Sequence, residues 1–302
     1  MKTKILVAGA TGNLGTRIVR ELLKNRADVR MVVRSETSSE KIESYKALGA
    51  EVYLCNNYNA AELRMACRDV TCVVSCLAGL REVIIDAQKA LLDAAVAEKV
   101  PRFIPSDFSL DFTKFHPGEN RNLDWRREFH AYLDQADIRA TTIFNGAFAD
   151  MLTNEMPLVL VKQKMILYWG NPEFKWHFTN MDNTAAYTAQ AALDPSTPRY
   201  LRIAGDLISP RTVREVASNV FGVKFRLFRP GGKRLLGFLI KVAKKFDSGK
   251  NELYPAWQGM QYMHNMIDPR AELASIDNDR YTGIRWTTVK DILTKYRAET
   301  TA

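Results

Sequence analysis

The chain has 302 residues, of which 46% are hydrophobic and 25% are charged, and its formal net charge is +9 at pH 7. This composition is ordinary for a globular protein, and no apolar run approaches the roughly 20 residues of a membrane span. No signal-peptide core is present, so we expect a cytoplasmic protein without a membrane partner. The basic residues are spread along the chain without a nucleic-acid motif, so we expect no nucleic-acid partner.

The four cysteines lie within one short window. They are Cys55, Cys67, Cys72 and Cys76. No pair has the CxxC spacing and no histidine lies beside them, so we expect no metal site. They are interpreted as small buried apolar residues in a reducing compartment.

Residues 5–15, Ile-Leu-Val-Ala-Gly-Ala-Thr-Gly-Asn-Leu-Gly, carry the first chemical signature. An apolar strand over 5–8 runs into a GxxGxxG turn, and an amphipathic helix over 16–24 follows. Strand, glycine turn and helix together predict a seat for the diphosphate of a dinucleotide. The alternative is a tight turn that needs glycine for its backbone angles alone. The predicted cofactor residues are Gly9, Thr11, Gly12, Asn13, Leu14 and Gly15.

The second predicted strand, residues 29–34, indicates which dinucleotide binds. An acidic residue near this strand end holds the ribose 2′-hydroxyl in NAD-binding units, but here the strand ends at Arg34 and Ser35. A guanidinium can bind a 2′-phosphate through two hydrogen bonds, and Lys41 follows. These residues predict NADP(H) rather than NAD(H). The alternative is that Arg34 and Lys41 are solvated surface charges.

Helices and strands then alternate, which predicts an α/β doubly wound parallel sheet. The expected helices are 40–48, 60–68, 81–99 and 123–135, and the expected strands are 51–55, 72–77, 102–104 and 139–144. Ligands bind at the carboxyl ends of such strands. We therefore expect Ala78, Gly79, Pro105 and Ser106 to contact the cofactor, and Asp107, Phe108, Asn145 and Phe148 to line a substrate pocket.

Beyond residue 150 this alternation loosens. We expect two domains, residues 1–150 binding the cofactor and residues 151–302 forming a smaller α+β substrate lobe packed on them. The expected elements are a hairpin or short strand pair of 166–170 and 174–178, helices over 182–192, 211–221, 233–246 and 288–298, and strands over 199–204 and 224–228. Helix 233–246 is basic and amphipathic, and we expect half of it in the core and half solvated, with a membrane-surface role as the alternative.

Three motifs together resemble a known family. They are Gly9-Ala-Thr-Gly-Asn-Leu-Gly15, Val33-Arg34-Ser35 and Arg102-Phe-Ile-Pro-Ser-Asp-Phe108. The chain resembles the NmrA-like and isoflavone-reductase-like group of atypical short-chain dehydrogenases. The resemblance implies a Rossmann-type sheet with a smaller C-terminal substrate domain, and it implies NADP(H) binding.

The expected catalytic groups depart from the family pattern. Ordinary short-chain dehydrogenases use a YxxxK pair, and no tyrosine here has a lysine four residues on. The isoflavone-reductase group carries a lysine on the helix after the Pro-Ser motif, and that position falls on Arg126. Arginine is a poor general acid but can bind an oxyanion. The substitute proton donors are His130 on the same helix face and Lys114 on the preceding loop, with Tyr132 and Asp107 as weaker candidates.

Two functions follow from this pattern. The first is an NADPH-dependent reductase of a small compound with a carbonyl group or an activated alkene, and aromatic compounds are among the candidate substrates. The second is a non-catalytic NmrA-like sensor that binds NADP(H) and acts through a protein partner. In either case we expect a monomer or a homodimer.

Overall fold

The computed structural model describes residues 3–56, 58–153, 156, 158–247, 249–273 and 275–301. Its largest sheet has six parallel strands in the order β3-β2-β1-β4-β5-β6. The strands are β1 (Lys4–Ala8), β2 (Asp28–Arg34), β3 (Glu51–Cys55), β4 (Cys72–Ser75), β5 (Arg102–Ile104) and β6 (Arg139–Ala140). This order is that of a doubly wound dinucleotide-binding sheet, so the predicted α/β fold class is confirmed.

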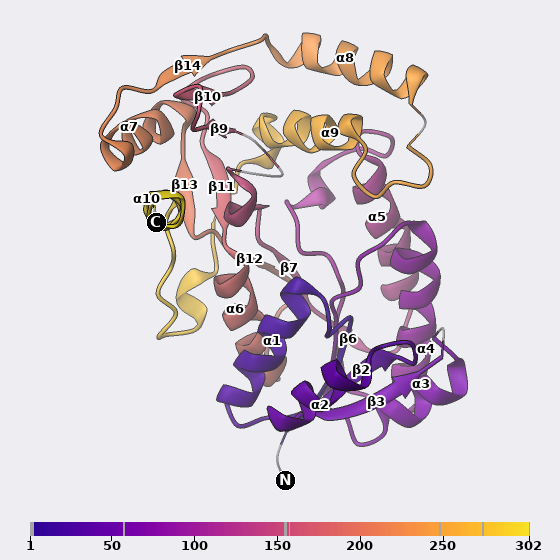
Figure 1. The fold of residues 1–302 in the computed structure, drawn as a ribbon. Helices are drawn as coiled ribbons and strands as arrows, with labels where there is room; N and C mark the ends of the chain where they lie inside the picture. Colours follow the sequence, from indigo (N-terminus) through magenta and orange to yellow (C-terminus); the bar gives the residue numbers. More distant parts are fainter. Residues whose placement is uncertain are drawn as a thin grey trace.

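Helices cover both faces of this sheet because its strands are apolar on both sides. Ile5 and Val7 pack with α1 (Asn13–Lys24) and α6 (Met181–Leu193), whereas Leu6 and Ala8 pack with the helices of the opposite face. Those helices are α3 (Ala60–Cys67), α4 (Gln88–Ala97) and α5 (Arg121–Leu133), while α2 (Ser39–Ala47) follows β2. Figure 1 shows α1 and α6 side by side and α3, α4 and α5 across the sheet from them. The alternation of side chains along each strand therefore produces the layered core.

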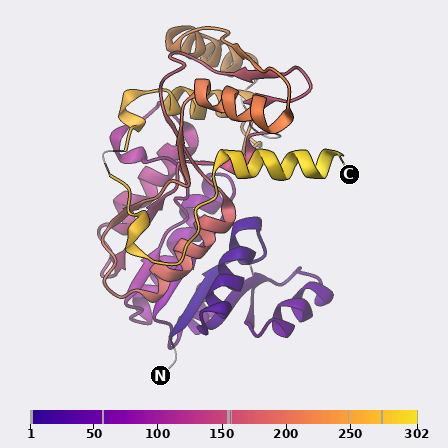
Figure 2. The same cartoon turned by 90° about the vertical axis from the view of Figure 1, so that its left-hand side faces the viewer.

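The rest of the chain builds a second lobe around a separate apolar core that includes Trp176, Phe178 and Leu293. Its strands are β7 (Thr142–Phe144), β8 (Ala147–Phe148), β9 (Val159–Leu160), β10 (Met165–Leu167), β11 (Trp176–Thr179), β12 (Tyr200–Arg202), β13 (Asp206–Ile208) and β14 (Arg226–Phe228). Its helices are α7 (Pro210–Phe221), α8 (Lys233–Phe246), α9 (Ala256–Met266) and α10 (Val289–Thr301). Figure 2 shows α10 extending sideways from the molecule.

The two lobes are interleaved in sequence. Helix α6 lies beyond residue 150 yet packs on α1, and β12 pairs in parallel with β7, which follows directly on β6. Short turns complete the chain: η1 (Glu82–Ala87) is π-helical and leads into α4, and η2 (Phe112–Lys114), η3 (Ala149–Met151), η4 (Pro269–Ala271) and η5 (Asn278–Arg280) are 3₁₀ turns. None of the helices in the described ranges has the length and apolar character needed to cross a membrane.

Several predicted elements differ from the structure. The predicted hairpin of 166–170 and 174–178 is wrong, because β10 pairs with β9 and β14 whereas β11 pairs with β8 and β13. The predicted strand 139–144 divides into β6 and β7, which belong to different sheets. Helix α9 was not expected, because polar amides such as Gln258, Gln261 and Asn265 occupy its buried face and interrupt the apolar period.

Candidate active site

In the glycine turn after β1, close contacts within the protein require glycine at two of the three positions. Gly9 has a φ of +71°, and a Cβ there would lie 2.5 Å from the carbonyl oxygen of Cys76. A Cβ on Gly15 would collide with the carbonyl oxygen of Gly9. Gly12 is different: it is exposed, its φ is −76°, and a Cβ would meet only the Gly9 oxygen, at 3.3 Å. The surface above Gly12 is therefore open to a ligand.

The N-terminus of α1 faces this open surface. Gly12 caps the helix without a side-chain hydrogen bond, and the first turn contains no acidic residue. First-turn N–H groups have no acceptor within their own helix, and the helix dipole favours an anion there. Arg17 on the next turn donates to Asn13 O at 3.0 Å and to Asp182 Oδ1 at 2.7 Å, which ties α1 to α6. The arrangement fits a diphosphate.

The predicted 2′-phosphate residues lie at the end of β2. Arg34 is its last residue, and Arg34, Ser35 and Lys41 are all exposed. Burial raises the pKa of the Tyr58 phenol, and the nearby Arg34 guanidinium opposes that rise. The guanidinium therefore lies on the β2–β3 side of the glycine turn, and its contact with a 2′-phosphate stays a prediction.

The loop after β5 is anchored beneath the same edge of the sheet. Ser106 donates from Oγ to Leu77 O at 2.6 Å, and its N–H donates to Gln88 Oε1 at 2.8 Å. These bonds tie the loop after β5 to the end of β4 and to α4, and beside them Ala78 is exposed and Gly79 half-buried. Arg126 donates from Nε to Ser106 O at 3.2 Å and so lies at this edge.

His130 lies in a buried polar network next to this loop. Its Nε2 lies 2.5 Å from Asp107 Oδ2, and its Nδ1 lies 3.3 Å from Arg199 Nη2. Because arginine only donates, Nδ1 accepts and Nε2 carries the hydrogen given to Asp107. Thr142 donates to the same Asp107 oxygen at 2.9 Å. Both nitrogens of His130 are therefore engaged within the protein.

Asp107 is fully buried, and its charge is balanced locally. Burial pushes the pKa of this carboxyl upward, but the His130 ring, the Arg126 guanidinium and the Thr142 hydroxyl outweigh it and lower the pKa. The other carboxylate oxygen has no hydrogen-bond partner among the described residues. Removing one of the groups that compensate this buried negative charge should therefore destabilise the fold.

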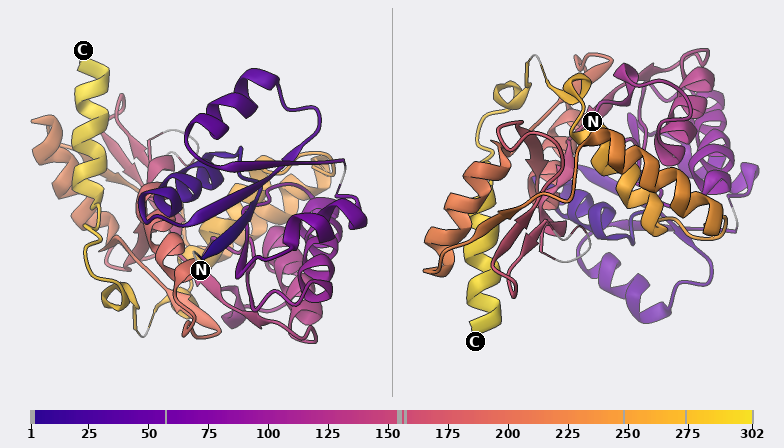
Figure 3. Two further views of the ribbon diagram at one scale, coloured as in Figure 1. Left: turned by 90° about the horizontal axis from the view of Figure 1, so that it is seen from below. Right: turned by 90° about the horizontal axis from the view of Figure 1, so that it is seen from above.

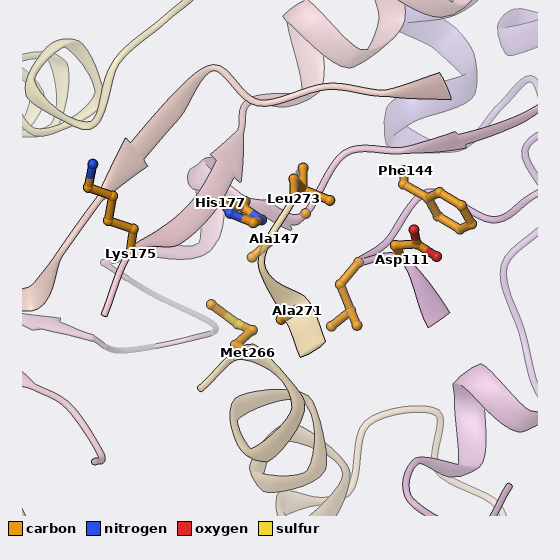
Figure 4. A pocket seen from close by; sticks show the side chains of 10 residues that line it. Asp111, Phe144, Ala147, Lys175, His177, Met266, Ala271 and Leu273 are labelled. Carbon is orange, nitrogen blue, oxygen red and sulfur yellow. The ribbon is translucent and has the colours of Figure 1, made fainter. Parts of the chain in front are cut away.

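A recess lies next to the predicted pocket residues rather than on them, and much of its apolar lining belongs to the core of the second lobe. Its cavity volume is small, about 20 Å³, and the space around it is partly open to solvent. Figure 4 shows its lining side chains, which are Leu110, Asp111, Phe144, Ala147, Lys175, His177, Met266, Ala271 and Leu273, with Gly146. Of the predicted pocket residues, Asp107, Phe108 and Asn145 are buried and Phe148 is half-buried. All four lie within three residues of a lining residue along the chain, and their contact with a substrate stays a prediction.

His177 is a site residue that the sequence analysis did not single out. It sits on β11 between the buried side chains of Trp176 and Phe178, and this alternation places it on the opposite face, toward the recess. Lys114 lies close by: its Nζ donates to Glu272 O at 2.7 Å, and Glu272 separates the lining residues Ala271 and Leu273. Burial, together with the charge of Lys114, lowers the pKa of His177 to about 4.

The depressed pKa of His177 makes stability depend on pH. The unfolded chain protonates this ring below its ordinary pKa of 6.5, whereas the folded chain does so only near 4. The free energy of unfolding should therefore decrease by up to about 3 kcal/mol as the pH falls from 6.5 to 4. Urea unfolding at several pH values measures this slope. His177→Gln should flatten it and His116→Gln, a change in an exposed loop, should not; equal slopes in all three proteins would contradict the assignment.

The four cysteines contribute no reactive group. All are free thiols, and three are buried. Burial raises the pKa of Cys55 and Cys72 to about 11 and that of Cys67 and Cys76 to about 12. Within the ranges that the structure describes, no group of three or more His, Cys, Asp or Glu side chains could hold a metal ion.

Comparison with known proteins identifies the family of this fold. The family model described as NmrA-like family matches residues 1–239. Pinoresinol reductase 1 of Arabidopsis thaliana is 32% identical over 211 residues, which are 65% of this chain and 66% of that protein. The chain thus spans just under two thirds of the length of this relative.

Solved structures support the same architecture. An isoflavone reductase superposes with a TM-score of 0.81 at 17% identity, over 98% of this chain and 100% of the other. Leucoanthocyanidin reductase from Vitis vinifera, solved in binary complex with NADPH, superposes with a TM-score of 0.78 at 17% identity, over 98% and 99% of the two chains. At these identities the two structures establish the fold alone.

Proposed function

The chain belongs to the NmrA-like family, and on this premise we propose that it is an NADPH-dependent reductase of a small aromatic compound that carries a carbonyl group or an activated alkene. The observation that carries the proposal is the open surface above Gly12 at the uncapped start of α1. It lies at the carboxyl edge of the parallel sheet, where ligands bind in this fold. Leu110 and Asp111, which also line the recess, follow β5 of the same sheet.

The proposed cofactor site uses three groups of residues. The diphosphate would lie on the first turn of α1, beside Thr11 and Gly12. The 2′-phosphate would be held by Arg34 and Ser35, with Lys41 nearby. The nicotinamide end would reach Ala78 and Gly79 and the anchored Pro105-Ser106 segment. These residues fit NADP(H) because each is exposed or is anchored at the carboxyl edge of the parallel sheet.

The substrate class is proposed from the recess and from the relatives. Phe144, Leu110 and Met266 supply apolar walls, and His177 adds a polar ring. Such a mixture suits a flat, mostly apolar compound with a few polar groups. The names of the relatives, pinoresinol reductase and isoflavone reductase, support an aromatic substrate.

The proposed chemistry assigns separate roles to the side chains of the chain. When bound, NADPH supplies the hydride. Lys114 has three N–H donors at the rim of the recess, and we assign it the transfer of a proton to the reduced substrate. Arg126, fixed at Ser106 O, would stabilise negative charge at the edge of the sheet. His130 would act as a positioning residue, since both of its ring nitrogens bind other side chains.

One experiment separates the reductase from the alternative, a redox sensor without catalysis. The purified protein is incubated with NADPH and a panel of aldehydes, quinones and aryl alkenes, and NADPH oxidation is followed by absorbance. Turnover with an aromatic member of the panel supports the reductase. Tight NADP(H) binding by calorimetry without turnover on any compound would instead favour the sensor.

Cofactor choice has its own test at Arg34. Arg34→Ala should weaken NADPH binding at least about tenfold and change NADH binding less than about twofold, because only NADPH has the 2′-phosphate that pairs with the guanidinium. Calorimetric titration with both nucleotides measures the difference. Arg20→Ala removes another exposed arginine, on α1, and should change neither affinity. Equal losses for both nucleotides in Arg34→Ala would contradict the assignment.

A further inference from the structure

Helix α8 exposes a continuous apolar line, which we call the outer stripe: Leu235, Phe238, Val242 and Phe246. Their exposed fractions are 43%, 61%, 36% and 85%. The spacing of three and four residues places them along one side of the helix. These four apolar residues therefore lie outside the half of the helix that is in the core.

The protein already covers a different part of the apolar surface of this helix. Leu236 and Ile240 are buried in the core of the second lobe, and α8 packs along α9. Figure 1 shows α8 along the top of the molecule with α9 beneath it, and the right-hand view of Figure 3 shows the two helices side by side. The outer stripe is therefore apolar surface beyond what the fold needs for its own packing.

A row of cations borders the outer stripe. Arg234, Lys241 and Lys245 are exposed, and at 100° per residue they fall on one line next to Phe238. The 14 residues of α8 include no acidic side chain. The remaining two lysines are engaged, since Lys233 pairs with Asp268 and Lys244 lies 4.7 Å from the centre of the Trp257 ring. The three cations of the row are thus available to an anionic partner.

We propose that the outer stripe docks on an anionic lipid surface. A helix that lies in a membrane interface presents large apolar side chains to the acyl region and basic side chains to the headgroups, as this one does. A second copy of the chain is a poorer fit, because a symmetric contact would bring two identical rows of cations together. This surface lies outside the proposed active site and does not depend on the reductase. It takes up the alternative given above for helix 233–246, and it differs from the expectation that the protein has no membrane partner.

The test is flotation of the full chain with lipid vesicles at low ionic strength. One vesicle is phosphatidylcholine alone and the other contains about 30% phosphatidylserine, a fraction that gives the surface a negative potential. The protein should float with the anionic vesicles and not with the neutral ones, and added salt should weaken binding. Phe238→Ser with Phe246→Ser, and separately Lys241→Glu with Lys245→Glu, should each reduce the bound fraction at least about tenfold.

Matched controls separate docking from a general effect of charge or folding. Lys162→Glu with Lys290→Glu changes the net charge equally at exposed sites elsewhere, and Met65→Ser removes an exposed apolar side chain from α3. Both controls should bind like the unmodified chain. The proposal is overturned if neither vesicle is bound, if both are bound equally, or if the stripe variants bind unchanged. It is also overturned if sedimentation shows that the stripe holds a dimer together instead.

Discussion

Replacement of Lys114 by methionine is expected to lower kcat about 100-fold while leaving the affinity for NADPH unchanged, because a general acid typically contributes at least that factor. Methionine keeps most of the length of the side chain and removes its N–H donors. Lys114 is exposed, and among the described residues its Nζ donates to the Glu272 carbonyl at the rim of the recess, so the fold should tolerate the change. Steady-state kinetics with the best substrate of the panel and calorimetry with NADPH measure the two quantities.

Lys175→Met is the matched control, since Lys175 is the other lysine at the recess. Figure 4 shows its side chain extending away from His177 and Asp111. We expect kcat to change less than about threefold in this variant. If Lys175→Met loses activity and Lys114→Met does not, the proton donor is Lys175 and our assignment of Lys114 is wrong. If neither variant loses activity, the donor lies outside this rim.

Removing the imidazole of His130 is expected to destabilise the fold by about 3 kcal/mol or more at pH 7, because it leaves a buried carboxylate with little compensation. In His130→Ala, the Asp107 carboxylate would keep, among the residues that the structure describes, only the Thr142 hydroxyl as a hydrogen-bond partner. The edge contact of the ring with Phe112, at 4.9 Å between ring centres, would also be lost. Denaturant unfolding of both proteins measures the change.

A double-mutant cycle distinguishes the hydrogen bond between Asp107 and His130 from simple packing. Asp107→Ala and His130→Ala together should cost less than the sum of the single changes, by at least about 1 kcal/mol, because the second change no longer strands a partner. His116→Ala, in an exposed loop, should change stability by less than about 0.5 kcal/mol. Additive losses in the cycle would show that the pair is not coupled.

The sequence predicted best those elements whose signals are local. The helix over 211–221 was expected from Ser209 before it and Gly222 after it, and the structure begins α7 at Pro210, capped by the Ser209 side chain, and ends it at a left-handed Gly222. The strands of the parallel sheet were recognisable as short apolar runs alternating with helices. In each case the signal for the element lies within the element or directly beside it in the sequence.

The sequence did not predict which strands of the second lobe pair with each other, nor a helix whose buried face is polar. Asn120, before α5, holds α9 through Gln258 and Asn265, so the buried face of α9 carries amides instead of a regular apolar pattern. The partners of β10 and β11 lie far away along the chain, and the short link between these two strands suggested a hairpin that does not form. Lobe assembly likewise brings His177 to the recess, and no local motif marks that.

The role of His130 could not be predicted from the sequence either. Its place on the helix face shared with Arg126 made it a candidate proton donor. Its surroundings come from three other segments, since Asp107 follows β5, Thr142 starts β7 and Arg199 precedes β12. Only their assembly occupies both ring nitrogens, and this is why Lys114 is the better proposal for the donor.

The central claim is that the first turn of α1 holds the diphosphate of NADPH, and calorimetric titration of the chain and of Gly12→Val tests it most directly. Gly12 has an ordinary φ, and a Cβ there would meet only the Gly9 oxygen, at 3.3 Å, so valine should lower the unfolding midpoint slightly. It should weaken NADPH binding about 100-fold by occupying the space of the diphosphate. A folded Gly12→Val protein that binds NADPH as tightly as the unmodified chain would contradict the account. So would an unmodified chain that binds neither NADPH nor NADP⁺ at millimolar concentration.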